Sequence, residues 1–235
     1  MKIVSNNKMI RRNKRIGNYT TIGSLVILGL GLYISFTAQT SDGFLWSLAC
    51  LLVGFLASQV GIFFGNRWGR SPRPDEHLNN ALKGLDDKYI LYHYTTSVSH
   101  LLVGPAGIWV LAPYQQQGRI TYDPNKMRWG QKGGNWYMKV FGQESLGRPD
   151  QEVNASLADI NSYLKKNVEI EGLPDPEAAL VFVHPKAVVD APNAHIATLH
   201  VEKLKDFIRR QAKEKPAPMD LIRLFQQVLP AESID

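Results

Sequence analysis

Two stretches decide the fold of this chain: GNYTTIGSLVILGLGLYISF at residues 17–36 and FLWSLACLLVGFLASQVGIFF at residues 44–64. Neither contains a charged side chain. Each is about as long as an α-helix must be to cross roughly 30 Å of hydrocarbon. Because only helices and closed barrels satisfy their backbone inside lipid, we expect two transmembrane helices. The polar residues 37–43 between them are enough for a tight turn.

The charges around these stretches predict their orientation. Residues 1–73 contain 9 Lys or Arg and 1 Asp or Glu, a net +8, so the remaining 18 basic and 20 acidic residues of the chain's 27 and 21 give −2. The basic residues precede the first stretch or follow the second, and the turn carries only Asp42. Lysine and arginine stay on the cytoplasmic side, so both termini and the soluble domain are predicted to be cytoplasmic in a multi-pass protein. The soluble part has no overall positive field that would attract nucleic acid.

Other interpretations of the apolar stretches are less favoured. A cleaved signal peptide has a shorter apolar region, about 7–15 residues, and begins closer to the N-terminus. A buried hairpin in a soluble core does not explain the basic flanks. Small residues recur at Ala57, Gly61 and Gly65, a spacing that lets helices approach closely. We expect them to pack the two spans together, with a homodimer as the alternative.

The domain boundaries follow from these features. We expect a basic N-terminal segment at residues 1–15, a two-helix hairpin at 16–66, a linker at 67–74 and a soluble domain at 75–235. The Pro-rich linker is stiff and non-helical. The soluble part is long enough for one ordinary core.

Hydrophobic periodicity predicts the elements of the soluble domain. Helices are expected at residues 75–85, 150–167, 201–213 and 219–229, and strands at 89–94, 98–103, 108–111, 119–122, 127–129, 136–140, 179–183 and 197–201. The fold class is therefore α+β or α/β, with helices packed against a sheet.

The block VSHLLVGPAGIWVL at residues 98–111, continuing to Gly118-Arg119-Ile120, resembles the nuclease-related domain (NERD) family. Supporting features are Glu76 on the first helix, Trp129 after the Gly-x-Ile strand, and Pro149-x-Gln151 opening a helix that contains Asn154. The resemblance covers about residues 75–227. It implies a restriction-endonuclease-like, PD-(D/E)xK-type fold: a mixed central sheet flanked by helices.

The chain departs from this family at each position that carries its chemistry. Ser99 stands where the family has an aspartate, and Ala112 and Tyr114 stand where it has a glutamate and a lysine. Two carboxylates hold the divalent metal of such nucleases, and the lysine orients or polarises the attacking water. Alanine cannot bind a metal, and tyrosine does not replace an ammonium group. We therefore expect no catalytic residues, no metal and no cofactor.

The alternative is a metal-dependent nuclease whose acids have migrated. Residual candidates are Glu76, Asp123 and Gln151, and only this alternative would require Mg²⁺. Asp123-Pro124-Asn125 is ordinary turn composition, however, so a turn is the better interpretation.

Other polar and aromatic residues have structural explanations. His93 and His100 are expected to face each other across adjacent strands and to be satisfied within the sheet, while His184 caps a strand end. The Gln115–Gln117 run is expected to be a solvated loop. Base stacking is conceivable for the aromatic residues of the strands, but cross-strand packing is the default: Trp109, Trp129, Trp136, Tyr122 and Tyr137.

The sequence thus predicts a membrane-anchored, catalytically inactive NERD-like protein. It would act as a binding or scaffolding module at the cytoplasmic membrane face. Its expected partners are the lipid bilayer and a protein or nucleic acid that the sequence does not identify. A transporter or channel subunit is disfavoured because the spans contain no ionisable side chain other than Cys50 and tyrosines.

Overall fold

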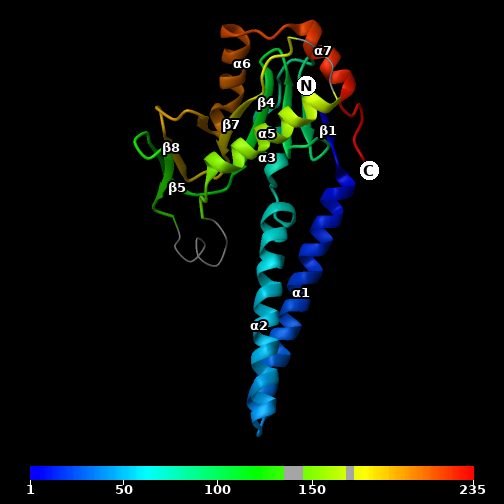
Figure 1. The fold of residues 1–235 in the computed structure, drawn as a ribbon, viewed down its shortest axis with the longest axis vertical. Coiled ribbons are helices and arrows are strands. Elements are labelled where there is room, and N and C mark those ends of the chain that lie inside the picture. The colour runs from blue at the N-terminus through cyan, green and yellow to red at the C-terminus, as the bar shows by residue number, and fades with distance from the viewer. Residues whose placement is uncertain (135–144, 168–171) are drawn as a thin grey trace. The chain divides into compact units, whose positions relative to one another are not determined.

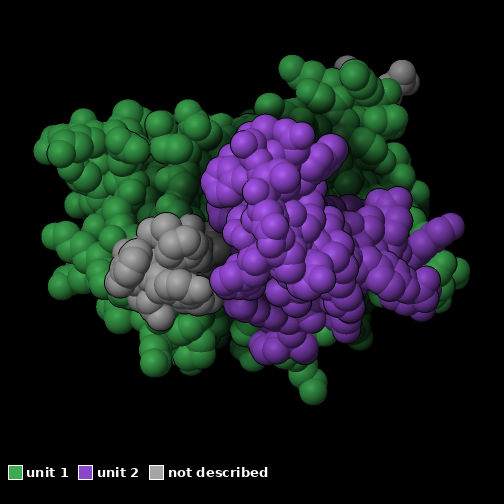
Figure 2. Space-filling model, turned by 90° about the horizontal axis from the view of Figure 1, so that it is seen from below, with its two compact units in different colours: residues 1–7, 74–235 green, residues 8–73 purple. Residues whose placement is uncertain are grey.

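The computed structural model describes residues 1–134, 145–167 and 172–235. The chain forms two compact units (Figures 1 and 2). One consists of residues 8–73, and the other combines residues 1–7 with residues 74–235. The N-terminal seven residues therefore belong to the soluble unit, which differs from the predicted boundary at residue 15.

The first unit is a helical hairpin. Helix α1 (Asn7–Thr37) and helix α2 (Ser41–Phe64) are each long and apolar enough to cross a bilayer. A π-helical turn at Gly65–Gly69 continues α2. Thr40 caps α2, because its Oγ1 accepts a hydrogen bond from the Gly43 N–H at 3.3 Å. Both predicted helices are confirmed, and α1 begins ten residues before its apolar stretch.

The hairpin buries its small and polar residues and exposes its large apolar ones. Glycine and serine are buried along α1 and α2: Gly17, Ser24, Gly31, Ser47, Gly54 and Gly61. Large apolar side chains are exposed throughout, including Leu25, Leu30, Phe36, Phe44, Leu48, Leu52, Phe55 and Val60. The core helix of a soluble protein has the opposite arrangement.

Close approach of the two helices explains the buried glycines. A methyl group at Gly61 would lie 2.5 Å from Oγ1 of Thr21, and one at Gly54 would lie 2.7 Å from Cγ of Leu28. The Ser47 hydroxyl donates a 2.8 Å hydrogen bond to the Gly31 carbonyl across the pair. Gly61 thus packs the two helices of one chain together, as small residues do in membrane helix pairs.

The soluble unit is built on a six-stranded mixed sheet of order β1-β2-β3-β4-β7-β9. Its strands are β1 (Lys2–Ser5), β2 (Ile90–His93), β3 (His100–Gly104), β4 (Gly107–Tyr114), β7 (Glu177–Phe182) and β9 (Ala197–His200). Strands β2, β3 and β4 are antiparallel neighbours. The pairs β1–β2, β4–β7 and β7–β9 are parallel.

Helices cover both faces of this sheet. Helices α5 (Pro149–Asn167) and α7 (Met219–Val228) pack on the face that carries Leu101, Val110 and Leu180. Helices α3 (Pro74–Leu82) and α6 (Leu204–Glu214) pack on the face that carries Leu102 and Val181. A short 3-10 helix at Val201–Lys203 precedes α6. Neighbouring residues of a strand point to opposite faces, so Leu101 and Leu102 enter different cores, as expected for a sheet that is buried on both faces.

Strands β5 (Gly118–Asp123), β6 (Arg128–Lys132) and β8 (Ala187–Asp190) form a separate sheet of order β6-β5-β8. The strand predicted at residues 119–122 is present as β5, but the single sheet expected from the sequence is corrected, because β5 belongs to this second sheet. The strand predicted at residues 136–140 lies outside the described residues. Strands β1 and β8 were not predicted. The mixed sheet with helices confirms the α+β class.

Strand β1 ties the N-terminus into the soluble unit. Its register sets Val4 opposite Tyr92, and Val4 is 1% exposed in the core beneath α5 and α7. Its neighbour Ile3 is 40% exposed.

We predict that Val4→Ala destabilises the soluble unit by on the order of 2 kcal/mol, because it removes two buried methyl groups. Thermal or denaturant unfolding of the full chain in mild detergent measures this. Ile3→Ala on the same strand is the control at a half-exposed position, and it should destabilise the unit less than Val4→Ala although it removes more atoms. Equal effects of the two changes would show that β1 is not part of the folded core.

Candidate functional site

The three positions singled out by the family resemblance lie on one face of the main sheet. Ala112 and Tyr114 are two residues apart on β4, so both side chains point to the same face. The β3–β4 register pairs Leu101 with Val110, and continuing it by two residues sets Ser99 opposite Ala112. Leu101 and Val110 pack on the face covered by α5. The fold therefore brings these positions together at one end of β3 and β4.

Tyr114 occupies this site and binds an acid from α5. The phenol is buried, and its hydroxyl donates a 2.5 Å hydrogen bond to Oε2 of Glu152. Its ring packs against Phe182 on β7, with 5.6 Å between ring centroids. Burial, and next the hydrogen bond to Glu152, raise the pKa of Tyr114 well above its usual value. The phenol therefore stays neutral across the physiological range, so it supplies a hydrogen-bond donor and no charge.

The glutamine run after Tyr114 is half-buried and partly ordered by hydrogen bonds, which corrects the prediction of a solvated loop. The side-chain amide of Gln116 donates to the Ser145 carbonyl at 3.1 Å. The Gln117 carbonyl accepts from the Gln131 amide on β6 at 2.8 Å. Two uncharged side chains, those of Gln116 and Gln131, satisfy backbone carbonyls and hold the β4–β5 connection against its neighbours.

The residual acids do not converge on this site. Glu76 is on α3, which packs on the opposite face of the sheet. Asp123 ends β5 in the second sheet, where its Oδ1 accepts from the backbone N–H groups of Asn125 and Lys126 at 3.0 and 3.3 Å. This confirms turn chemistry for Asp123. Gln151 is exposed in the first turn of α5.

His93 and His100 form a buried pair on the α3 face. They are register partners in β2 and β3, and their Nδ1 atoms lie 2.8 Å apart. Nε2 of His93 is 2.9 Å from Oδ1 of Asn79 on α3. A neutral imidazole has one N–H, so a His93 that donates from Nε2 accepts at Nδ1 from His100. The expected cross-strand pair is confirmed.

The remaining predicted residues serve packing and caps. Trp109 is buried, donates to the Ala106 carbonyl at 2.8 Å and meets Phe207 edge-on. Trp129 and Tyr122 are cross-strand partners in the second sheet, with 4.7 Å between ring centroids and ring planes tilted by 55°. Nδ1 of His184 accepts from the Lys186 N–H at 3.0 Å, which confirms its cap. Cross-strand and core packing is thereby confirmed for these aromatic residues, while Trp136 and Tyr137 lie outside the described residues.

Sequence reasoning missed two acids. Asp75 is 3% exposed in the first turn of α3, where the positive end of the helix dipole favours a carboxylate. Glu152 binds Tyr114 from the first turn of α5. In both cases the available signal was an acid in the first turn of a helix that begins with a proline. Within the three described ranges, no three His, Cys, Asp or Glu side chains gather as metal ligands.

Comparison with known proteins gives no match: no family model fits the sequence, and neither a curated protein nor a solved structure is significantly similar to it.

We predict that Tyr114→Phe destabilises the soluble unit by about 1–2 kcal/mol, because it removes a hydrogen bond to a carboxylate. Tyr92→Phe is the matched control. Tyr92 is also buried, but its hydroxyl has no partner among the described residues, so its removal should cost nothing. The two variants are compared by thermal unfolding of the full chain near pH 7.

The pH dependence of unfolding provides a second measurement. The folded pKa of Tyr114 lies above the usual tyrosine value of 10.0, so its contribution to stability is complete below pH 10 and is lost as the pH rises further. Tyr114→Phe should therefore reduce the loss of stability above pH 10. An unchanged alkaline profile would contradict the assignment.

Proposed function

We propose that this chain is a membrane-anchored, NERD-like protein that binds or scaffolds a partner at the cytoplasmic face and does not cleave nucleic acid. The observation that carries the proposal is the state of the sheet face at Ser99, Ala112 and Tyr114. Where the family resemblance places two carboxylates and a lysine, this face has a hydroxyl, a methyl group and a buried neutral phenol bound to Glu152.

The chemistry of these groups supports loss of nuclease activity. A divalent-metal nuclease stabilises the charge of its transition state through a metal held by carboxylates. At Tyr114 the nearby carboxylate of Glu152 accepts a hydrogen bond from the neutral phenol. The mixed sheet with helices on both faces is compatible with the restriction-endonuclease-like fold that the resemblance implies.

Membrane insertion is supported by the hairpin's exposed apolar residues and buried glycines. Lipid replaces water around such a helix pair, so outward leucine and phenylalanine are favourable there. Both ends of the hairpin connect to the same folded unit, because residues 1–7 and 74–235 form one unit. A single folded unit lies on one side of a membrane, so the hairpin crosses twice. Cleavage after the first helix would remove β1 from the sheet, which argues against a signal peptide.

The positive flanks support a cytoplasmic location for this side. Four of the cations before the first apolar stretch share one exposed helical face of α1: Lys8, Arg11, Arg12 and Arg15. Their spacing of three and four residues aligns them, and anionic lipid headgroups attract them. The lipid bilayer is thus the first partner. Since Gly61 packs against Thr21 of its own chain, a homodimer through Ala57, Gly61 and Gly65 is not part of the proposal.

A nuclease assay tests the proposal. The full chain in detergent should not cleave single- or double-stranded DNA in Mg²⁺ or Mn²⁺. Cleavage is measured with end-labelled DNA, using EDTA-treated samples as the blank. Metal-dependent cleavage that is lost in Glu76→Gln or Asp123→Asn, with thermal stability retained, would instead establish the alternative of a nuclease with migrated acids.

A further inference from the structure

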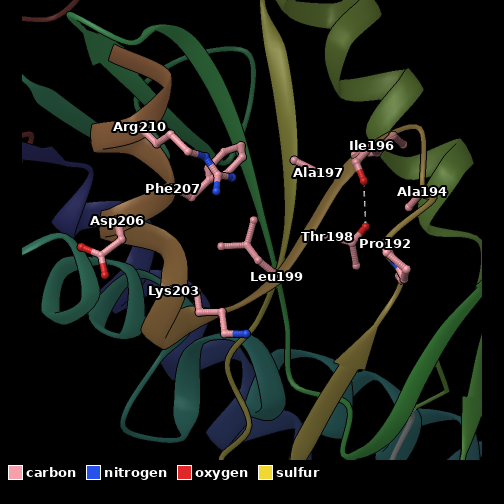
Figure 3. A pocket seen from close by; sticks show the side chains of 11 residues that line it. Pro192, Ala194, Ile196, Ala197, Thr198, Leu199, Lys203, Asp206, Phe207 and Arg210 are labelled. Carbon is pink, nitrogen blue, oxygen red and sulfur yellow. Dashed lines mark hydrogen bonds between the residues drawn. The ribbon is translucent and has the colours of Figure 1, made fainter. Parts of the chain in front are cut away.

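A groove of about 590 Å³ lies beside strand β9, on the soluble unit (Figure 3). Strand β9 lines it with Ala197 to Leu199, α6 with Phe207 and Arg210, and the loop after β8 with Pro192. It is separate from the face that carries Ser99, Ala112 and Tyr114, which α5 covers. Its walls combine apolar side chains with the backbone of a strand.

The two edges of the main sheet differ in how they are covered. At the β1 edge, the C-terminal tail bridges to Asn6, and the Ile234 N–H donates to the Ser5 carbonyl at 2.9 Å. The Ser5 N–H in turn donates to Oγ of Ser233 at 3.0 Å. At the other edge, no strand in the described part of the chain pairs with the outer side of β9. A protein that covers one edge and leaves the other open beside a groove has a template for strand addition.

The backbone of β9 has hydrogen-bonding groups available for an added strand. Strand β9 is parallel to β7, from Ala197 opposite Ala179 to His200 opposite Phe182. In a parallel pair, alternate residues direct their N–H and C=O groups to the neighbour, and the intervening residues direct theirs away. Within the described ranges, the outward groups of Ala197–Leu199 make no hydrogen bond to another backbone group. Main-chain hydrogen bonds are therefore the main means of binding at this edge.

The charge of the groove selects among extended segments. Lys203 and Arg210 extend toward it from the α6 side, whereas the Asp206 carboxylate points away (Figure 3). Asp206, which also lines the groove, lies 4.0 Å from Arg209. The Arg210 guanidinium lies 5.7 Å from the Phe207 ring centroid, and its Nε is 4.0 Å from the exposed Glu214 carboxylate, a solvent-screened pair that an incoming carboxylate can replace. Two cations thus flank an apolar floor that includes Leu199. Carboxylates form charge-assisted hydrogen bonds with such groups.

We propose that the groove binds an extended acidic segment of a partner protein, which adds to β9 as a further strand. Alternate side chains of the segment would face the apolar floor and the pair Lys203 and Arg210. Strand β9 has four residues, so the paired part spans roughly 13 Å at 3.3 Å per residue. This inference rests on the proposed function and assigns the binding site and the class of partner.

Peptide selection tests the inference. The full chain, in phosphatidylcholine nanodiscs, is panned against a display library of random twelve-residue peptides, and fluorescein-labelled forms of the enriched peptides are measured by anisotropy. The enriched peptides should alternate apolar and acidic residues. Arg210→Glu and Lys203→Glu should each weaken binding at least tenfold. Lys213→Glu, an exposed cation of α6 outside the groove, is the matched control and should bind normally.

Two further readouts test strand addition itself. N-methylation of alternate peptide amides should abolish binding in one of the two registers, because it removes the main-chain donors. Hydrogen exchange at residues 197–200 should slow in the complex. Failure to enrich any peptide, selection of basic or uncharged peptides, or equal binding to Arg210→Glu would overturn the inference. These outcomes are independent of the DNA cleavage assay. If no acidic peptide binds the groove, the inference fails but the proposed function stands. If the chain cleaves DNA, the proposed function fails whatever peptide the groove binds.

Discussion

The parallel pairing of β1 with β2 is the constraint on which the arrangement of this protein depends. Four residues ahead of the first long helix join a strand 85 or more positions later, with Val4 opposite Tyr92. The pairing closes the chain around the hairpin, because the residues before α1 and those after α2 become parts of one folded unit. The hairpin is therefore an insertion within the sequence of a single folded unit. If it enters a membrane, it must cross that membrane an even number of times.

The hairpin reverses the usual distribution of side chains. Gly54 and Gly61 let α2 approach Leu28 and Thr21, and the Ser47 hydroxyl bonds the Gly31 carbonyl. In lipid there is little hydrophobic drive to join two helices, so close backbone packing and hydrogen bonds provide the association. The same small residues would be a poor core in water.

Elements with strong periodicity could be predicted from the sequence. The two charge-free stretches indicated α1 and α2, and the period of Val153, Ile160 and Leu164 indicated α5. Asp123 was recognisable as a turn residue because its signal is local. Strand β1 was not predictable, because four residues before a basic run have no period of their own and are ordered only by a distant partner. The separation of β5, β6 and β8 from the main sheet likewise depends on tertiary packing.

The contacts of the candidate site were likewise not predictable from local sequence. The family resemblance singled out three positions, and continuing the β3–β4 register sets Ser99 opposite Ala112. The bond from Tyr114 to Glu152 joins residues 38 positions apart through the packing of α5 on the sheet, and no local pattern encodes it. The groove at β9 also arises from three separate segments, so only the fold reveals it.

Cysteine accessibility tests the central claim, that both ends of the hairpin lie on the same cytoplasmic side, most directly. In a background with Cys50→Ala, single cysteines at Lys2, Ser41 and Ser71 report the N-terminus, the turn and the exit from α2. A membrane-impermeant thiol reagent should label Ser41→Cys in intact cells, and Lys2→Cys and Ser71→Cys only after permeabilisation. Labelling of Lys2→Cys and Ser71→Cys from opposite sides, or of Ser71→Cys from outside, would contradict the account.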